Sequence, residues 1–421
     1  MSAKPLPYGL HLVETDDVLA VREVLHDGFV RSGRLAEAEA DDILSILSGE
    51  LLAQGPEVKR FEQAFAAKVR SEAAVACSSG TAALHLALKA LDVGPGDVCV
   101  APAITFLSTA TAAIFCGAEV VFADVDPDTG LMTSATLREA CERAGGPVKA
   151  ALPVHLGGRL CDMAALSQTA QSLGLVLVED CCHALGSEHH INGLAGENRF
   201  AEASVFSFHP VKTIACGEGG MVTTNSPVLA ARIDRLRNHG VTRQPELLTD
   251  AELSLDQAGG PNPWSYEQLE LGFNYRMTEI EAALGRSQLG KLDRFADRRR
   301  QLSAAYDRLL EPLSPWIRPI RAAADETVSP HLYPVHLHLA ASGLDRAGLM
   351  RALLGKGIGT QVHYIPVYRQ PYFVGRYGAQ RLPGAEAYYS STLSLPLFPA
   401  MADEDVQRVV LELALALGAK L

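Results

Sequence analysis

Short apolar runs alternate with segments of helical periodicity from about residue 57 onward. The apolar runs are predicted strands, at 73–77, 98–102, 119–125, 148–155, 175–179, 204–208 and 221–224. Apolar residues three or four positions apart predict helices between them, at 57–69, 81–91, 108–115, 134–143 and 163–173. Short apolar strands separated by helices indicate an α/β fold with a mainly parallel, buried sheet and helices on both faces.

The second half of the chain follows a different pattern. Residues 242–263 are polar and rich in Gly and Pro, which predicts a long loop. A single long helix is predicted over 277–310, and a C-terminal helix over 403–417. We therefore divide the chain into an N-terminal segment, a large domain, and a long helix with a smaller α+β domain, at 1–56, 57–265 and 266–421.

Composition narrows the possible environments of the protein. The formal net charge of −12 argues against nucleic-acid binding, and the basic triplet Arg298–Arg300 is expected on a solvated helix face. The eight cysteines include no Cys-x-x-Cys pair, which favours free thiols in a reducing compartment. No apolar run approaches the roughly 20 residues that span a bilayer, and the N-terminus lacks a hydrophobic signal core. We expect a soluble cytoplasmic protein.

The candidate chemistry centres on Lys212, in Phe-Ser-Phe-His-Pro-Val-Lys-Thr (206–213). About thirty residues upstream, Glu179 and Asp180 end the apolar run 175–178. A lysine that can form a Schiff base, with a carboxylate that keeps a pyridine nitrogen protonated, is the minimal protein equipment for pyridoxal phosphate chemistry. Both groups follow predicted strands, and ligands of parallel sheets gather at the carboxyl ends of strands.

Several neighbours admit either a functional or a structural role. Ser78-Ser79-Gly80-Thr81 precedes a predicted helix and suits an anion such as phosphate, although an ordinary helix cap is the commoner meaning. His183, Phe106 and Ser207 could contact a cofactor, or they could be structural residues. His189 and His190 are assigned to a solvated turn rather than to a metal site.

Seven motifs together resemble the DegT-like family of nucleotide-sugar aminotransferases, which are fold-type I pyridoxal phosphate enzymes. They are Gln-Gly-Pro-Glu-Val (54–58), Ser-Ser-Gly-Thr-Ala-Ala-Leu (78–84), Ile-Thr-Phe (104–106), Asp-Val-Asp-Pro-Asp-Thr-Gly (124–130), Glu-Asp-Cys-Cys-His-Ala-Leu-Gly (179–186), Phe-Ser-Phe-His-Pro-Val-Lys (206–212) and Gly-Phe-Asn-Tyr-Arg-Met-Thr (272–278). The resemblance runs from about residue 51 to the C-terminus. It implies an aspartate aminotransferase-like fold, with a mainly parallel seven-stranded sheet and a smaller C-terminal α+β domain.

The resemblance also implies residue roles. Lys212 would hold the cofactor as a Schiff base and later shuttle a proton, and Asp180 would pair with the pyridinium nitrogen. The remaining cofactor contacts would be made by Phe106 and His183 beside the ring, and by Gly80, Thr81 and Ser207 at the phosphate. Asn274 would reach the phosphate of the neighbouring subunit, so a homodimer with shared active sites is expected.

Within the family, the segments 237–243, 263–267, 361–367 and 394–399 are similar to those of C4 aminotransferases of pseudaminic acid biosynthesis. Such enzymes make UDP-4-amino-4,6-dideoxy-N-acetyl-β-L-altrosamine from a UDP-4-keto sugar, with L-glutamate as the usual donor. By this likeness the substrate would be lined by Tyr8, Leu52, Ala53, Gln54, Gly55, Ala82, His363, Tyr364, Ile365 and Pro366.

The chain departs from the family near 27–47, where about twenty extra residues lie beside the presumed sugar-binding edge. Other nucleotide sugars, of bacillosamine or perosamine type, need the same C4 chemistry and stay open as substrates. A sugar dehydratase of the same family would carry histidine in place of Lys212. A regulatory cofactor-binding protein without turnover is the third reading.

Overall fold

The computed structural model describes residues 18–22, 52–53, 55–339 and 343–419. Its centre is a seven-stranded sheet in the order β1-β9-β8-β5-β4-β2-β3. The strands are β1 (Ala73–Cys77), β2 (Val98–Pro102), β3 (Glu119–Ala123), β4 (Ala150–Ala151), β5 (Val176–Asp180), β8 (Ala203–Ser207) and β9 (Gly220–Thr224). β9 pairs antiparallel with β1 and with β8, and all other pairs in this sheet are parallel. The predicted fold class, with a mainly parallel seven-stranded sheet, is confirmed.

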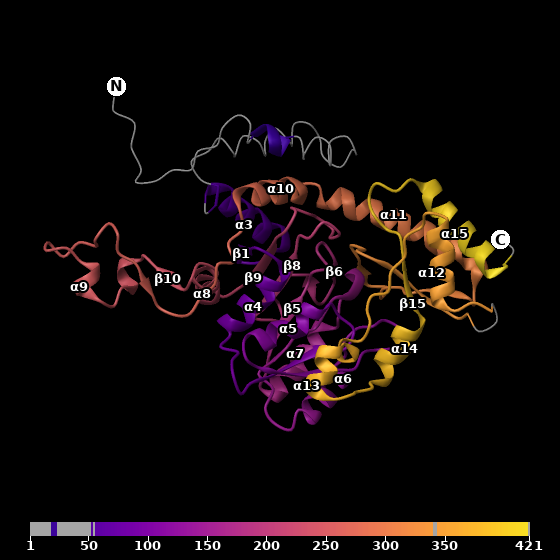
Figure 1. Cartoon of the computed structure of the whole chain (residues 1–421), viewed down its shortest axis with the longest axis horizontal. Helices are drawn as coiled ribbons and strands as arrows, with labels where there is room; N and C mark the ends of the chain where they lie inside the picture. The colour runs from indigo at the N-terminus through magenta and orange to yellow at the C-terminus, as the bar shows by residue number, and fades with distance from the viewer. Residues whose placement is uncertain (1–17, 23–51, 54, 340–342, 420–421) are drawn as a thin grey trace.

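Helices cover both faces of the sheet, as Figure 1 shows. One face packs against α4 (Gly80–Ala90), α5 (Leu107–Phe115) and α8 (Pro227–Arg237). The opposite face packs against α3 (Pro56–Val69), α6 (Ser134–Arg143), α7 (Met163–Leu173) and α10 (Glu279–Leu289). Because side chains alternate along a strand, Val178 faces the first layer and Leu177 the second. Both faces are therefore apolar, as the uninterrupted strand sequences predicted.

The helix expected over 277–310 is two helices, α10 and α11 (Leu292–Leu310), so the single-helix prediction is wrong. The break falls at Gly290 and Lys291, where glycine weakens a helix. The two helices serve different layers. Gly285 of α10 lies so close to Phe61 of α3 that a Cβ atom would stand 2.8 Å from its ring. The apolar face of α11 from Leu302 onward packs into the second core.

The second core is formed by residues between 302 and 417. It joins α11 to a three-stranded antiparallel sheet and two helices: β12 (Ile317–Pro319), β14 (Tyr333–Leu337), β15 (Thr392–Leu395), α12 (Arg346–Gly355) and α15 (Asp403–Leu417). By contrast, η5 (Val367–Arg369), α13 (Pro371–Tyr377) and α14 (Pro383–Ser391) contribute side chains to the core of the large sheet. The C-terminal portion of the chain thus contacts both cores, and the domain boundaries given above stay predictions.

Residues 242–263 form most of a projecting arm, visible beside α8 in Figure 1. The arm starts and ends in the paired strands β10 (Val241–Thr242) and β11 (Glu267–Gln268). Between them lie the short helices η3 (Pro245–Leu247) and α9 (Ala251–Ser254), which the loop prediction did not foresee. The Glu267 carboxylate accepts hydrogen bonds from Thr249 N and Ser254 Oγ and so ties the arm together at its base.

Arg299 departs from the expectation of a solvated basic triplet. Its side chain is buried, because it lies on the same stripe of α11 as Ala296 and Leu302. Instead of a carboxylate, it donates hydrogen bonds to the carbonyl oxygens of Pro330, His331 and Leu397. Burial lowers the pKa of Arg299 to about 10. Arg299 therefore joins α11 to two segments of the small domain.

Candidate active site at the carboxyl ends of the central strands

Asp180 is the last residue of β5 and is buried. Strand alternation sends its side chain toward α5, where Thr109 Oγ1 donates to Asp180 Oδ2 at 2.8 Å. The backbone N–H of Cys182 donates to Oδ1 at 3.1 Å, and Thr105 Oγ1 lies 2.7 Å from Thr109 Oγ1. The carboxylate is thus fixed at both oxygens. Sequence reasoning missed both threonines, although their i, i+4 spacing after β2 was a usable signal.

Glu179, which precedes Asp180, faces the opposite side of the sheet. Its Oε2 lies 3.1 Å from His155 Nε2, and both side chains are buried. The alternation of strand side chains therefore decides which acid of the Glu-Asp pair belongs to the candidate site.

Lys212 lies in the connection between β8 and β9, in a turn closed by a 2.8 Å hydrogen bond from its own N–H to His209 O. Its side chain is half-buried. Burial lowers the pKa of the Lys212 amine, against the opposing effect of Cys182 and Asp180. A lysine with a lowered pKa has a larger neutral fraction, which is the form that attacks a carbonyl.

The predicted phosphate residues meet at the N-terminus of α4. Gly80 packs so closely on Ser207 that a Cβ atom on the glycine would lie 2.7 Å from Ser207 Cβ. Ser79 caps the helix by accepting a 3.1 Å hydrogen bond from the N–H of Ala82, so for Ser79 the ordinary cap is the correct reading. Gly80 and Thr81 stand in the first turn, where helix N–H groups lack intrahelical partners and favour an anion.

His331 and Tyr364 lie beside the buried His183, with ring centroids 4.5 Å and 6.1 Å from that of His183. Its Nδ1 accepts a 3.3 Å hydrogen bond from Gly157 N–H, and its Nε2 lies 3.2 Å from Tyr364 Oη. Burial, with the Lys212 charge, holds the pKa of His183 well below its usual range. Phe106 lies next to Tyr364 on the solvent side, with 55% of its surface exposed and its ring centroid 6.2 Å from that of Tyr364.

The predicted substrate residues come from two separate parts of the chain. Leu52, Ala53 and Gly55 are held by the start of α10, where Glu279 N donates to Leu52 O and Gly55 N donates to Glu279 Oε1 at 2.8 Å. Sequence reasoning missed Glu279, a buried carboxylate that also accepts from the N–H of Glu57 at the start of α3. Tyr8 and Gln54 lie outside the described residues.

The second group, at 363–366, lies close to the cofactor residues. His363 Nδ1 lies 2.8 Å from Ser394 Oγ, and burial with the Lys212 charge lowers the pKa of His363 to about 4. Tyr364 contacts His183 as described above, Ile365 is exposed and Pro366 is buried. The remaining predicted contact, Ala82, is buried within α4.

Asn274 is exposed on its own chain and is joined to Asn238 by a backbone bridge. Its neighbour Tyr275 accepts a 2.9 Å hydrogen bond from Ser78 N–H, beside the phosphate residues.

Comparison with known proteins decides the family. The profile of the DegT/DnrJ/EryC1/StrS aminotransferase family matches residues 34–414. The chain belongs to this family. Spore coat polysaccharide biosynthesis protein SpsC of Bacillus subtilis (strain 168) is 35% identical to this DegT-family chain over 408 residues, which are 96% of the chain and 95% of SpsC.

Solved structures agree with this DegT-family assignment. Helicobacter pylori PseC, an aminotransferase involved in the biosynthesis of pseudoaminic acid, has a TM-score of 0.80 at 28% identity, with 91% of this chain and 97% of PseC covered. Spr1654 of Streptococcus pneumoniae, solved in a PLP form, has a TM-score of 0.80 at 27% identity over the same shares. It is also solved in a PMP form. The chain is a pyridoxal phosphate-dependent aminotransferase.

The residues of this DegT-family chain fit the cofactor chemically. Asp180 would supply a fixed anion for a pyridinium nitrogen, and Lys212 would supply an amine for the cofactor's carbonyl. Gly80, Thr81 and Ser207 meet at a helix N-terminus that suits the phosphate. His183 and Phe106 supply apolar ring surface nearby.

Two clusters of metal-ligand residues lie among the described residues, His155–Glu179–Cys181 and His189–His190–Asp325. In the first, His155 Nδ1 accepts a hydrogen bond from Cys161 N–H, and in the second, His189 Nδ1 accepts from Ile191 N–H. On the other side of each ring, His155 Nε2 lies 3.1 Å from Glu179 Oε2 and His189 Nε2 lies 3.2 Å from Asp325 Oδ2. The members of each cluster therefore contact one another directly.

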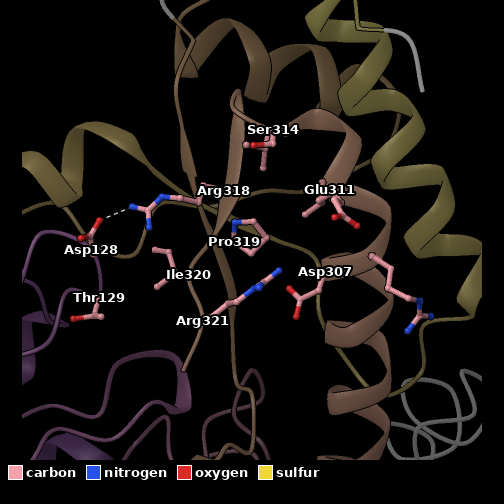
Figure 2. Close-up of a pocket in the computed structure, with 12 residues that line it drawn as sticks. Asp128, Thr129, Asp307, Glu311, Ser314, Arg318, Pro319, Ile320 and Arg321 are labelled. Carbon is pink, nitrogen blue, oxygen red and sulfur yellow. Dashed lines mark hydrogen bonds and ion pairs between the residues drawn. The ribbon is translucent and has the colours of Figure 1, made fainter. Parts of the chain in front are cut away.

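A cavity of about 600 Å³ lies apart from this site, between the loop at Asp128–Thr129 and the small domain (Figure 2). Arg318 pairs with Asp128 across it, and Arg321 extends toward Asp307. Charges of both signs line the cavity, and none of the predicted site residues does.

Proposed function

We propose that this aminotransferase transfers an amino group from L-glutamate to C4 of a UDP-4-keto-6-deoxy-N-acetylhexosamine. The product would be UDP-4-amino-4,6-dideoxy-N-acetyl-β-L-altrosamine of the pseudaminic acid pathway. The main support for amino transfer is that Lys212 and the fixed carboxylate of Asp180 belong to the same site, where the charge of Asp180 acts on the Lys212 amine. The structural likeness to PseC supports the choice of sugar.

A second candidate is C4 amination of another nucleotide sugar, of bacillosamine or perosamine type. The likeness to SpsC, whose name places it in polysaccharide biosynthesis, favours it, because SpsC shares 35% identity against 28% for PseC. A difference of about 1–3 kcal/mol in pocket contacts separates such closely related substrates.

The chain's residues divide the chemistry among them. When bound, pyridoxal phosphate would supply an electron sink for the carbanion at the reacting carbon and a carrier for the amino group. Asp180 keeps the ring nitrogen protonated, because a fixed anion stabilises the neighbouring cation. The Nζ atom of Lys212 removes and returns the proton at the reacting carbon, a task that its lowered pKa favours. Leu52, Ala53 and Gly55 form one wall for the sugar nucleotide, and the segment 363–366 forms another.

We also propose a homodimer with shared active sites. The projecting arm exposes Trp264, at 71% of its surface, and Leu271, which follows β11, is 74% exposed. Such exposure is unusual for a monomer surface and suits burial against a second copy. Asn274, exposed near the end of the arm, would then complete the partner's phosphate site.

Mixing two inactive variants tests the shared site. Lys212→Ala and Asn274→Ala chains, unfolded together and refolded, form mixed dimers in which one site has both intact residues. Random mixing makes half of the dimers mixed, so roughly a quarter of wild-type activity should return. No recovery in verified mixed dimers would show that Asn274 acts within its own chain, and an active Asn274→Ala homodimer would show that it has no role.

The proposed location is the cytoplasm. All eight cysteines are free thiols in the structure, and most are buried. Burial raises the pKa of Cys77 and Cys181 to about 12, so these thiols resist oxidation and suit a structural role. No helix in the described part of the chain is long and apolar enough to cross a membrane.

The substrate is tested with ¹⁵N-labelled glutamate and the L-arabino and D-xylo epimers of the UDP-4-keto-6-deoxy sugar. Mass spectrometry should find labelled amino sugar from the L-arabino epimer, and none with Lys212→Ala. Product from the D-xylo epimer alone would move the enzyme to a bacillosamine-type sugar. If the holoenzyme aminates neither epimer, both the pseudaminic acid assignment and the bacillosamine-type assignment are refuted.

A further inference from the structure

His183 has no polar atom left for a cofactor. Its Nδ1 accepts the N–H of Gly157, so the proton of the neutral ring is on Nε2. That Nε2–H points at Tyr364 Oη, 3.2 Å away. Because its low pKa keeps His183 neutral, both ring nitrogens are committed within the protein. His183 can therefore pack against a cofactor ring, but it cannot donate a hydrogen bond to it.

Tyr364 is the next member of this chain of hydrogen bonds. Its oxygen accepts from His183, and its own proton is left to donate. Burial and the charge of Asp180 raise the pKa of Tyr364, so the hydroxyl keeps that proton at neutral pH. Within the described residues, no hydrogen bond uses that proton.

The location of Tyr364 points to what accepts the proton. Asp180 and Cys182 both influence its ionisation, so the hydroxyl is close to the acid that would hold the pyridine nitrogen. The two oxygens of Asp180 already take donors from Thr109 and Cys182. The ring of Tyr364 stacks with His183 at an interplanar angle of 26° and lies beside the exposed Phe106. The free proton thus belongs to the cofactor site.

We propose that Tyr364 donates a hydrogen bond to the phenolic oxygen of bound pyridoxal phosphate, and that His183 is the positioning residue that orients Tyr364. This inference rests on the pyridoxal phosphate-dependent activity and deepens it. The phenolic carbon is two ring positions from the nitrogen, so a donor near Asp180 is on the correct side of the ring. The hydrogen bond stabilises the ionised phenolic oxygen and lowers the pKa of the bound chromophore.

The test is a pH titration of the visible absorption of the holoenzyme, without substrate. Tyr364→Phe should raise the apparent pKa of the bound chromophore by about one to two units, because a hydrogen bond to a charged oxygen is lost. His183→Phe should cause a smaller rise, because Tyr364 keeps its proton but loses the group that orients it. Tyr368→Phe is the matched control, since that hydroxyl donates to Glu386 instead. Its titration should match the wild type.

An unchanged titration in Tyr364→Phe would overturn the proposal, and so would a full shift in His183→Phe alone. If Tyr364→Phe does not retain the cofactor, a structure of the wild-type holoenzyme decides the matter. A Tyr364 Oη atom beyond hydrogen-bond distance of the phenolic oxygen would then refute it. The titration needs no sugar substrate, so it gives its answer even if the proposed nucleotide sugar is wrong.

Discussion

Replacing Glu279 with glutamine should loosen the segment that we assign to the sugar nucleotide. The buried carboxylate accepts Gly55 N–H at Oε1 and Glu57 N–H at Oε2, both at 2.8 Å. An amide keeps one acceptor oxygen and turns an NH₂ group toward the other N–H. The variant loses one charge-assisted hydrogen bond, together with the favourable interaction of the negative charge with the N-terminus of α3. The expected loss is about 2–3 kcal/mol of unfolding free energy.

Urea denaturation measures this loss, with Glu281→Gln as the matched control. Glu281 is on the same helix and accepts hydrogen bonds from Thr278 N and Oγ1, but these bonds are exposed to water. Its replacement should cost less than about 1 kcal/mol. With the sugar substrate, Glu279→Gln should raise KM more than it lowers kcat, because the wall of the site moves while Lys212 does not. Equal destabilisation by the two variants would refute the reasoning.

Three further predictions concern other buried groups. Thr109→Val should weaken cofactor binding roughly tenfold or more, because Asp180 loses a charged hydrogen bond. Equilibrium dialysis measures the affinity for the cofactor, and an unchanged affinity would contradict the role given to Thr109. Arg299→Met should lower the unfolding free energy by about 1–3 kcal/mol, because three carbonyl groups lose their donor. The control Arg298→Met, on the half-exposed side of α11, should lower it only a little. Similar losses of unfolding free energy in the two variants would argue against a role for the buried contacts of Arg299. From pH 6.5 down to about 4 the unfolded chain takes up a proton at His363 while the folded chain does not, so stability falls as pH falls. Because His363 is only partly buried, its titration contributes about 1–2 kcal/mol to the unfolding free energy. If the stability of a His363→Gln variant varied with pH as steeply as that of the wild type, this contribution would be excluded.

The strands of the large sheet were predictable because each is a short apolar run whose length matches a single crossing of the sheet. Predicted and observed bounds coincide at β1 and β2, and they differ by one residue at β5, β8 and β9. The strand expected over 148–155 is much shorter, since the continuous strand covers Ala150–Ala151 and Val154 adds a separate bridge to Asp180. Pairing depends on neighbours that are distant in sequence, and no local pattern shows where it stops.

Asp180 and Lys212 were predictable because each stands in a motif with a chemical purpose. Glu279, Thr109 and Arg299 were not, because their importance comes from partners far along the chain. Arg299 is polar in sequence and lies on the buried stripe of α11, so periodicity and residue type gave opposite answers. For Tyr364 the resemblance predicted a place at the substrate, whereas the structure shows its contact with His183.

The segment that carries Lys212 connects β8 to β9, and Ser207 and Gly220 at its two ends pair across these strands. Ser207 also packs closely against Gly80. Lys212, which we assign to the cofactor's carbonyl, and Gly80, which we assign to its phosphate, are therefore attached at the same end of the central strands. The walls assigned to the acceptor are attached elsewhere, at α10 and at the segment 363–366. An engineer could exchange the wall at α10 for the equivalent of a relative and leave the cofactor machinery undisturbed, whereas the segment 363–366 carries Tyr364 and would have to keep it. Such a division lets one catalytic apparatus acquire new sugars through changes at its periphery.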